Sequence, residues 1–452
     1  IIANPNGISC NGCSFINAPN SALTTGAVSY DQAGNIQFDT SGNANAVSIG
    51  SGGLDANGNL VKNNSNFSVI SRQILLDGTV EGSDRVDIIS GSNVYDFTQG
   101  SQNANGPKGS ITKKAGAGSV NGLQIDASNV SSVQAGKINI VGTESGVGVQ
   151  LSGNVDATAG NIEIDSDGNL VIGGSVSASQ DVRATTGNGA DIENSGSITG
   201  RLSVSIDSAG SFTNETTGEI TGSNIAIEAL DSVSNAGSIG AFNVTSTFEV
   251  TAATTRASEV AVGLANAISQ MDGVTARANG GEIILEVPDS IANNPDYPLI
   301  VEIELLDGTI TELPVAKSGN EFTIDLRTIA SSSLQVGAQL RLKTGADAVI
   351  DANTVQNTGS VIAQRSLTVT ADTVTNTGSD ALLAAGTDIN VDAREIANAD
   401  QARIYADENV SLDADESVSN AGLITGVDAV IDANTVQNTG SVIAQRSLTV
   451  TA

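Results

Sequence analysis

Short runs of alternating apolar and polar residues recur along most of this 452-residue chain. Two of them read NIEIDSDGNLVI from Asn161 and RSLTVTADTVT from Arg365. Alternation with a period of two places the apolar side chains on one face of a β-strand, and β-branched residues favour that conformation. The pattern therefore predicts many short, half-buried strands, with helical periodicity confined to one segment.

These strands belong to a repeat of about 20 residues. Each repeat is recognised by an asparagine that is followed by a turn and a strand of small apolar residues. The asparagines are Asn194, Asn214, Asn235, Asn357, Asn376, Asn398, Asn420 and Asn438. In addition, the 25 residues Asp347–Ala371 recur unchanged at Asp428–Ala452. Units of this length are typical of a β-solenoid, in which one coil holds about three short strands.

The fold class that we predict is all-β, a right-handed parallel β-helix. Its coils stack at roughly 4.8 Å, so that equivalent positions form columns. We expect Val, Ile, Leu and Ala to fill the narrow interior, which leaves no space for large aromatic rings. We expect Asn and Gly to occupy corners with positive φ. An array of immunoglobulin-like sandwiches is the alternative, but it requires units of about 100 residues with aromatic cores.

One interval, from Asn235 to Asn357, interrupts the repeat and contains roughly 100 residues more than a coil. A helical stripe is formed by Val260, Leu264, Ile268 and Met271. Strand-like runs begin at Glu282, Leu299, Thr309, Glu321 and Gln339. Asp307-Gly308 between two of these runs indicates a hairpin. We therefore predict a small α+β domain at residues 241–345, inserted between β-helix repeats at 108–240 and 346–452.

The charge of the chain excludes one class of partner. Its 19 Lys and Arg against 50 Asp and Glu give a net charge of −31. An acidic surface repels phosphates, so we expect no nucleic-acid partner. The chain has no His, which excludes Ser-His-Asp and Cys-His catalysis. Carboxylate pairs are too common here to indicate a glycosidase, and solvated turns are favoured over calcium sites. We expect no enzyme, no catalytic residues, no metal and no cofactor.

The two cysteines, Cys10 and Cys13, flank the turn pair Asn11-Gly12. A zinc site would need further soft ligands, and the chain has no other Cys and no His. A thioredoxin-like redox pair would begin a helix beside a βαβ unit, which nothing here indicates. In an oxidising compartment we expect a Cys10–Cys13 disulfide, with free thiols as the alternative. Because the closed loop is short, the disulfide would stabilise one turn and contribute little to the stability of the whole fold.

Residues Asn4, Pro5, Asn6, Gly7 and Ile8 read NPNGI, and further matches follow at Phe15–Gly26 and Ser68–Phe97. These stretches resemble filamentous-haemagglutinin-like exoproteins of two-partner secretion. In that family a secretion domain precedes long arrays of ~20-residue repeats like those found here. The resemblance implies that residues 1–107 are the C-terminal part of a β-helical secretion (haemagglutination activity) domain, with NPNGI as its secretion motif. A plain turn is the alternative, since the first four residues are all turn formers.

The same resemblance implies a location and partners. Such proteins are exported unfolded through an outer-membrane β-barrel transporter and are secreted or displayed on the bacterial surface. The leading interpretation is a fragment of a fibrous adhesin that binds a surface glycan, a matrix polysaccharide or a receptor protein on a neighbouring cell. The alternative is the stick of a contact-dependent growth inhibition protein that delivers a toxin. The apolar opening Ile1-Ile2-Ala3 makes us expect a fragment, although a removed leader would give the same start.

Overall fold

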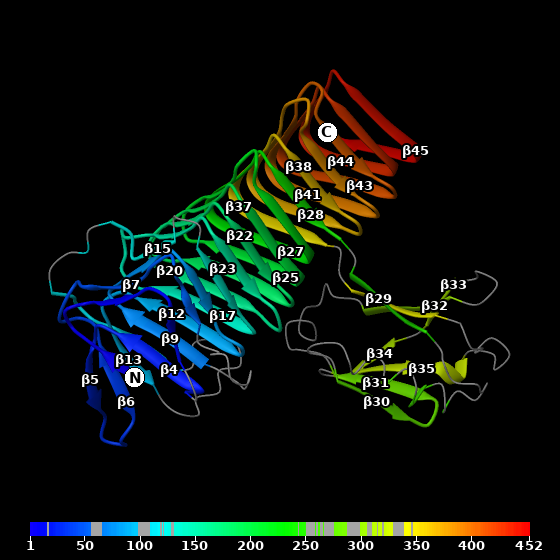
Figure 1. The fold of residues 1–452 in the computed structure, drawn as a ribbon. Helices are drawn as coiled ribbons and strands as arrows, with labels where there is room; N and C mark the ends of the chain where they lie inside the picture. The colour runs from blue at the N-terminus through cyan, green and yellow to red at the C-terminus, as the bar shows by residue number, and fades with distance from the viewer. Residues whose placement is uncertain are drawn as a thin grey trace. The chain divides into compact units, whose positions relative to one another are not determined.

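Two compact units make up the chain, one formed by Ile1–Gly240 with Ala348–Ala452 and the other by Ala241–Asp347. The computed structural model describes residues 1–15, 18–55, 66–97, 109–117, 120, 122–127, 131–242, 244–249, 258, 261–262, 265, 275–286, 299–304, 310–313, 315–318, 321–328, 339–344 and 347–452. The first unit is a parallel β-solenoid built on one 33-stranded sheet (Figure 1). The alternating pattern of the sequence therefore folds as predicted, into coils and not into separate sandwiches.

The coils of the solenoid each contribute three parallel strand segments. The strands of the first coils are β1 (Ile2–Ala3), β2 (Ile8–Cys10), β3 (Cys13–Ser14), β4 (Asn20–Thr24), β7 (Ala46–Ile49), β8 (Leu54–Asp55), β9 (Asn66–Ser71), β10 (Gln73–Leu76), β11 (Thr79–Glu81), β12 (Arg85–Ser90), β15 (Ile125–Ala127), β16 (Ser132–Ala135), β17 (Lys137–Gly142), β18 (Val149–Leu151) and β19 (Asn154–Ala157). Those of the following coils are β20 (Ile162–Ser166), β21 (Leu170–Ile172), β22 (Ser175–Ala178), β23 (Asp181–Thr186), β24 (Ile192–Asn194), β25 (Ser197–Ser208), β26 (Phe212–Asn214), β27 (Glu219–Asn235) and β28 (Ser238–Ala241). Those of the last coils are β37 (Ala348–Asn357), β38 (Ser360–Ala363), β39 (Leu367–Asn376), β40 (Leu382–Ala385), β41 (Asp388–Asn398), β42 (Arg403–Ala406), β43 (Asn409–Asn420), β44 (Leu423–Asn438) and β45 (Ser441–Thr451).

The interior of the solenoid consists of columns of small and branched apolar side chains. In one column Ile206 pairs in register with Ile227, and Ile227 with Ile350, and all three are at most 1% exposed. Alternate residues of these strands face solvent, so the period of two in the sequence becomes an inside and an outside. Burial of such apolar surface contributes about 25 cal/mol per Å², which makes the columns the main source of stability.

The repeating asparagines do not occupy positive-φ corners, and that prediction was wrong. Among the described residues other than glycine, only Asn188 and Gln401 have positive φ. The repeating asparagines end strands with their side chains inside the solenoid. From Asn194 to Asn438, each Nδ2 donates to the Oδ1 of the next asparagine at 2.7–2.9 Å. We call this column the asparagine ladder. A buried amide needs both a hydrogen-bond donor and an acceptor nearby. The identical residues one coil before and one coil after supply them.

The asparagine ladder starts at Asn194 for a visible reason. In the preceding coil the equivalent position is Ile172, which cannot donate a hydrogen bond. The Oδ1 of Asn194 is therefore buried with no hydrogen-bond partner. At the other interruption the ladder continues, because Asn235 donates directly to Asn357 at 2.8 Å across 122 residues of sequence.

Two glycines beside the ladder are explained by close approach, whereas Gly378 has a φ of 113°. A Cβ on Gly359 would lie 2.1 Å from the carbonyl oxygen of Gly237, and one on Gly237 would lie 2.2 Å from that of Gly218. Neither Gly359 nor Gly237 has positive φ. The tight turns of successive coils thus stack so closely that only glycine fits between them.

The expected exclusion of aromatic rings from the interior was wrong at two positions. Phe212 is fully buried between Ile192 and Val233 of the neighbouring coils. Phe67 is fully buried between Ser21 and Val86. In the column of Phe67 the neighbour on one side is small, which leaves volume for one ring.

One outward-facing column of the solenoid is acidic. It contains Asp207, Glu228, Asp351, Thr370, Asp392, Asp413 and Asp432 in register. All but Asp207 are exposed. Like charges directly opposite one another in a sheet are destabilising, so this column reflects solubility and not stability.

The second unit contains two four-stranded antiparallel sheets. The first has the order β29 (Val244–Glu249), β36 (Gln339–Thr344), β32 (Leu299–Glu304) and β33 (Ile310–Leu313). The second has the order β30 (Thr275–Asn279), β31 (Glu282–Glu286), β35 (Glu321–Asp325) and β34 (Val315–Ser318), and the 3-10 helix η1 (Leu326–Thr328) follows β35. Strands therefore lie where the sequence indicated them.

The predicted helical stripe of Val260, Leu264, Ile268 and Met271 lies outside the described residues, as does Asp307-Gly308. Their neighbours carry some information. Ala261, Val262 and Ala265 are helical, and both alanines are buried. Glu304 of β32 pairs antiparallel with Ile310 of β33, so these two strands are antiparallel neighbours, and the turn itself lies outside the described residues.

Candidate export site in the first coils

The NPNGI motif, residues Asn4 to Ile8, forms the turn between β1 and β2. The Oδ1 of Asn4 accepts a hydrogen bond from the backbone N–H of Asn6 at 3.1 Å. The carbonyl oxygen of Asn4 accepts another from the N–H of Gly7, also at 3.1 Å. Gly7 has a φ of 106°, where a Cβ would be strained. The motif is therefore an Asx turn whose last corner requires glycine.

The backbone of this turn is tied to the next coil while its side chains face solvent. The N–H of Asn4 donates to the carbonyl oxygen of Thr24 at 3.0 Å, and Nδ2 of Asn45 donates to that of Pro5 at 2.7 Å. Ile8 pairs with Val47 in β7. Asn4, Pro5 and Asn6 are all exposed. This geometry is consistent with a plain turn and equally with a surface that another protein recognises.

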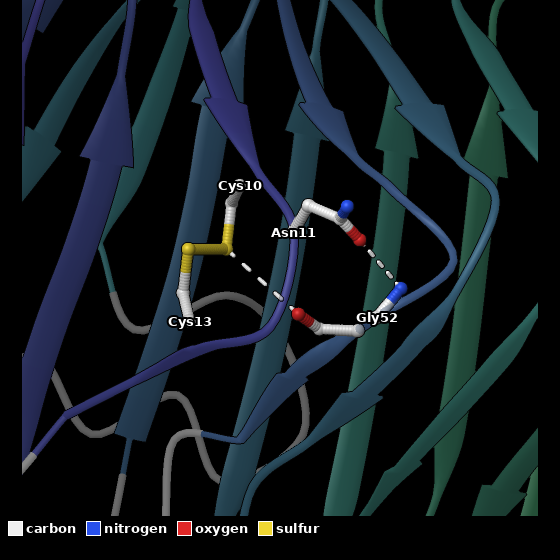
Figure 2. The surroundings of a disulfide bond; sticks show 5 residues. Cys10, Asn11, Cys13 and Gly52 are labelled. Atoms are coloured by element: carbon white, nitrogen blue, oxygen red, sulfur yellow. Dashed lines mark hydrogen bonds between the residues drawn. A yellow bond between two sulfur atoms is a disulfide. The ribbon is translucent and has the colours of Figure 1, made fainter.

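Cys10 and Cys13 are joined by a disulfide, with their Cα atoms 5.7 Å apart (Figure 2). The turn that they enclose rests on a glycine-rich turn of the next coil. The N–H of Gly12 donates to the carbonyl oxygen of Gly53 at 2.9 Å, and the N–H of Gly52 donates to Oδ1 of Asn11 at 2.6 Å. Cys10 is only 1% exposed. The disulfide thus holds one turn in place above another.

Replacing both cysteines with serine is expected to have a small and local effect. A closed loop this short removes little chain entropy, so the loss of unfolding free energy should be at most about 2 kcal/mol. Thermal unfolding measures that loss, and hydrogen exchange should increase only around residues 8–14 and 50–54. In untreated protein collected outside the cytosol, mass spectrometry should find no thiol that can be alkylated. Two free thiols in that sample would contradict the prediction.

A second, antiparallel sheet covers one outer face of the first coils. It consists of β5 (Ala27–Tyr30), β6 (Ile36–Asp39), β13 (Asn93–Phe97) and β14 (Ser110–Lys113), in the order β14-β13-β6-β5. The buried residues between this sheet and the solenoid are Ala22, Phe38, Ile70, Ile89, Tyr95 and Phe97. Outward-facing Ile70 and Ile89 therefore become core residues. Burial raises the pKa of Tyr95 well above its usual range, and its hydroxyl accepts from the N–H of Gly109 at 2.9 Å.

Polar residues beneath and beside this covering sheet are also buried. Ser68, Asp87, Asn139 and Glu163 occupy one outward-facing column. Asp87 is 1% exposed and accepts from Nδ2 of Asn139 at 2.7 Å, while Nε of Arg85 lies 3.2 Å away. Farther along, burial raises the pKa of Glu163 above its ordinary value. The buried carboxylate of Asp87 is tolerated because Asn139 donates a hydrogen bond to it and the Arg85 guanidinium pairs with it.

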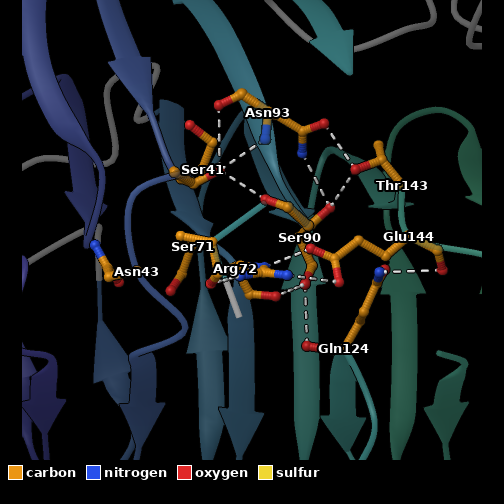
Figure 3. Close-up of polar contacts among 12 residues, drawn as sticks. Ser41, Asn43, Ser71, Arg72, Ser90, Asn93, Gln124, Thr143 and Glu144 are labelled. Atoms are coloured by element: carbon orange, nitrogen blue, oxygen red, sulfur yellow. Dashed lines mark hydrogen bonds and ion pairs between the residues drawn. The ribbon is translucent and has the colours of Figure 1, made fainter. Parts of the chain in front are cut away.

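A buried arginine links the first coils through hydrogen bonds and an ion pair (Figure 3). Arg72 is 4% exposed, and its Nε donates to Oε1 of Glu144 at 2.5 Å. Its Nη1 donates to the carbonyl oxygen of Ala117, also at 2.5 Å. Ser90 places its Oγ 3.0 Å from the carbonyl oxygen of Arg72 and 3.1 Å from that of Gln124. Breaking such a pair would leave an uncompensated buried charge.

Our sequence analysis missed this network, although one signal was present. Arg72 is the single charge in the apolar run SVISRQILL, and an arginine within such a run must pair when it is buried. Its partner Glu144 lies 72 residues away, which no local pattern indicates.

The described residues contain no group of three His, Cys, Asp or Glu placed to hold a metal ion. In the same part of the chain no helix has the length and apolar character needed to cross a membrane.

Comparison with known proteins gives consistent similarities for this part of the chain. The family described as "TPS secretion domain" matches residues 1–172. The match extends beyond residue 107, where our sequence analysis ended the secretion domain; that boundary stays a prediction.

Individual relatives match stretches of similar length. "Toxin CdiA" of Yersinia pestis is 33% identical over 201 residues, which are 44% of this chain and 6% of that protein. "tRNA nuclease CdiA" of Yersinia mollaretii is 36% identical over 177 residues, 39% of this chain and 5% of that protein. "Filamentous hemagglutinin" of Bordetella pertussis is 34% identical over 180 residues, 38% of this chain and 4% of that protein. The matched part of the chain spans only a small fraction of these relatives' length.

A crystal structure of a filamentous hemagglutinin secretion domain is 22% identical, with a TM-score of 0.30, over 52% of this chain and 63% of that one. The family match covers the coils that hold the NPNGI turn, the covering sheet and Arg72. Residues 1–172 therefore match a TPS secretion domain, and the chain is similar to filamentous-haemagglutinin-like proteins of two-partner secretion.

Proposed function

We propose that this chain is part of a large bacterial surface adhesin. In this proposal it is exported through an outer-membrane β-barrel transporter and mediates attachment to cells, matrix or surfaces. The observation that carries the proposal is the TPS secretion domain at residues 1–172, whose sheet continues without a break into the repeat coils. The chain itself has no catalytic role in this proposal and serves to export, to extend and to bind.

The exposed NPNGI turn is the part of the secretion domain that we propose the transporter reads. Its side chains face solvent, and its backbone is anchored to Thr24 and Asn45 of the next coil. The first coils are further held by the disulfide, the covering sheet and Arg72. Once formed, they provide a template on which later coils add one at a time, because each coil contacts only its neighbours.

The second unit is the best candidate for a binding module that this part of the fibre presents. Strand β27 pairs with β37, and β28 with β38, so the coils before and after the insertion contact each other directly. The insertion thus leaves the solenoid intact, and insertions between coils often form the binding face of repeat proteins. We propose that the second unit binds a surface glycan, a matrix polysaccharide or a receptor protein.

Contact-dependent growth inhibition is the second candidate function. It is favoured by the relatives named toxin and tRNA nuclease CdiA, which match this chain over lengths similar to that of the haemagglutinin match. In that case the solenoid would carry a toxin to a neighbouring cell. A toxin segment in the full-length protein, with an immunity gene beside its own, would decide for this candidate.

Removal of residues 242–345 tests the adhesin proposal. We expect a variant with a short Gly-Ser turn in their place to be secreted, because the two-residue corner Arg201-Leu202 joins the equivalent strand segments within another coil. Its β-sheet circular dichroism per solenoid residue should match that of the parent chain, while attachment to cells or matrix falls. The control is the parent chain, secreted in the presence and absence of the transporter. Undiminished attachment would refute the binding role of the second unit, and collapse of the solenoid would refute its independence.

A further inference from the structure

The outer face of the last coils changes character on one side. The outward-facing residues of β38, β40, β42, β44 and β45 include Ile362, Leu382, Ala384, Tyr405, Leu423 and Ile443. We call these six residues the apolar strip. None of them is buried, and Tyr405 is 44% exposed. Arg403, between Leu382 and Leu423, and Thr425, between Tyr405 and Ile443, interrupt the strip, which therefore combines apolar and polar groups as binding surfaces commonly do.

The same side of the earlier coils is polar. Equivalent outward positions there are occupied by Asp156, Ser177, Thr199 and Thr221. The change to apolar residues occurs from β38 onward. The outward positions of the strip's five strand segments also carry no Asp or Glu, although the chain has a net charge of −31 and the neighbouring column is acidic. A surface that served solubility alone would keep its polar and acidic residues. Both are lost together on this side of the last coils.

Polar groups at the centre of the strip are available to a ligand. Arg403 lies two residues before Tyr405 on the same side of β42, is exposed, and makes no ion pair with any described residue. The hydroxyl of Tyr405 donates to Oδ1 of Asp407 at 2.5 Å, which restrains the ring. Ligand sites commonly combine apolar and aromatic surface with a few directed polar groups.

The size of the strip limits what can occupy it. Five coils at about 4.8 Å and strands of about 13 Å give a face of roughly 300 Å². A stable protein interface buries about 800 Å² on each partner, so the strip is too small for one. It is long and narrow along the solenoid axis, which suits a linear ligand. The acidic net charge would repel a polyanion, and the outward positions of the strip carry no Asp or Glu to attract a polycation, while the Asp407 carboxylate beside it accepts from the Tyr405 hydroxyl.

We propose that the apolar strip binds an uncharged linear polysaccharide laid along the solenoid axis. The apolar C–H face of a sugar ring would pack on Tyr405 and its aliphatic neighbours, and the sugar hydroxyls would hydrogen-bond to Arg403 and Thr425. This site is separate from the second unit, and it holds or fails independently of the adhesive role proposed for that unit.

The test is calorimetric titration of the whole chain with neutral cello-, manno- and N-acetylglucosamine oligosaccharides, with oligogalacturonate as the anionic probe. We expect a neutral oligosaccharide to bind and Tyr405→Ala to weaken it by about tenfold, since a lost ring contact corresponds to roughly 1.4 kcal/mol. Tyr405→Phe should retain binding, and Ser419→Ala, on another face of the next coil, should not change it. Tyr405 is exposed, so thermal unfolding should show all three variants folded.

Several results would overturn the proposal. They are no binding of any neutral oligosaccharide, binding that Tyr405→Ala leaves unchanged, or stronger binding of oligogalacturonate. Sedimentation of the parent chain and of Tyr405→Ala at rising concentration provides a further check. Self-association that Tyr405→Ala abolishes would assign the strip to a second copy of the chain and refute the polysaccharide. Binding that persists in the chain lacking residues 242–345 would support the site on the solenoid even if that deletion did not affect adhesion.

Discussion

Asn398→Ala is expected to be among the most destabilising single substitutions in the solenoid. The side chain is 2% exposed, accepts from Nδ2 of Asn376 at 2.9 Å and donates to Oδ1 of Asn420 at 2.7 Å. Truncation would leave a donor on one side and an acceptor on the other without their partners in the ladder. Each such buried group costs about 1–3 kcal/mol, so we expect a loss of roughly 2–5 kcal/mol in unfolding free energy.

The measurement should be local as well as global, because repeat proteins need not unfold in one step. Denaturant unfolding followed by circular dichroism gives the total loss. Hydrogen exchange should show the largest increase in the coils that contain Asn376, Asn398 and Asn420. The matched control is Asn390→Ala, an exposed asparagine of the same strand, which should change stability by less than about 0.5 kcal/mol. Equal effects of the two substitutions would show that the ladder does not contribute through its buried hydrogen bonds.

Gly174→Ala is expected to have an effect of similar size through a different mechanism. A Cβ at this position would lie 2.0 Å from the carbonyl oxygen of Gly153 and 2.7 Å from its carbonyl carbon. These are backbone atoms of the preceding coil, so no side-chain rotation can relieve the clash. Overpacking usually costs about 1–3 kcal/mol, and because the clashing atoms are backbone we expect about 3 kcal/mol or more.

The adjacent residue provides the control. A Cβ on Gly173 would have its closest contact at 3.4 Å, with Oγ of Ser152, which is an ordinary van der Waals distance. Neither glycine has positive φ, so backbone strain does not distinguish them. Gly173→Ala should therefore be nearly neutral in thermal unfolding, while Gly174→Ala lowers the midpoint by several degrees. A neutral Gly174→Ala would show that the coils can separate locally at little cost.

Expected effects elsewhere are smaller for a physical reason. The Cys10–Cys13 disulfide closes a loop with a sequence separation of only 3, which constrains the unfolded chain little. Tyr405 lies on the surface, where its removal leaves no cavity. The asparagine ladder and the glycine turns, in contrast, are repeated in coil after coil, and a defect in one coil also affects the coils on both sides of it.

Much of the architecture could be predicted from the sequence because the repeat is local and periodic. Alternation such as NIEIDSDGNLVI specifies which side chains lie inside, and the spacing of the asparagines specifies the length of a coil. The change of composition between Asn235 and Asn357 was enough to indicate a second unit. The NPNGI motif and its family resemblance identified the secretion domain, because that signal is contained in a few adjacent residues.

Tertiary structure alone decided what the repeated residues do. In the sequence Asn398 and Gly359 look like turn formers, and only stacking shows that the asparagine is a buried link and that the glycine permits close approach of two backbones. The fully buried Phe212, the pairing of Arg72 with Glu144 across 72 residues, and the apolar strip around Tyr405 were equally invisible to a linear reading. Local patterns determine the conformation of each strand, whereas these features depend on which residues lie one coil above and below, and that is set by the exact length of every coil.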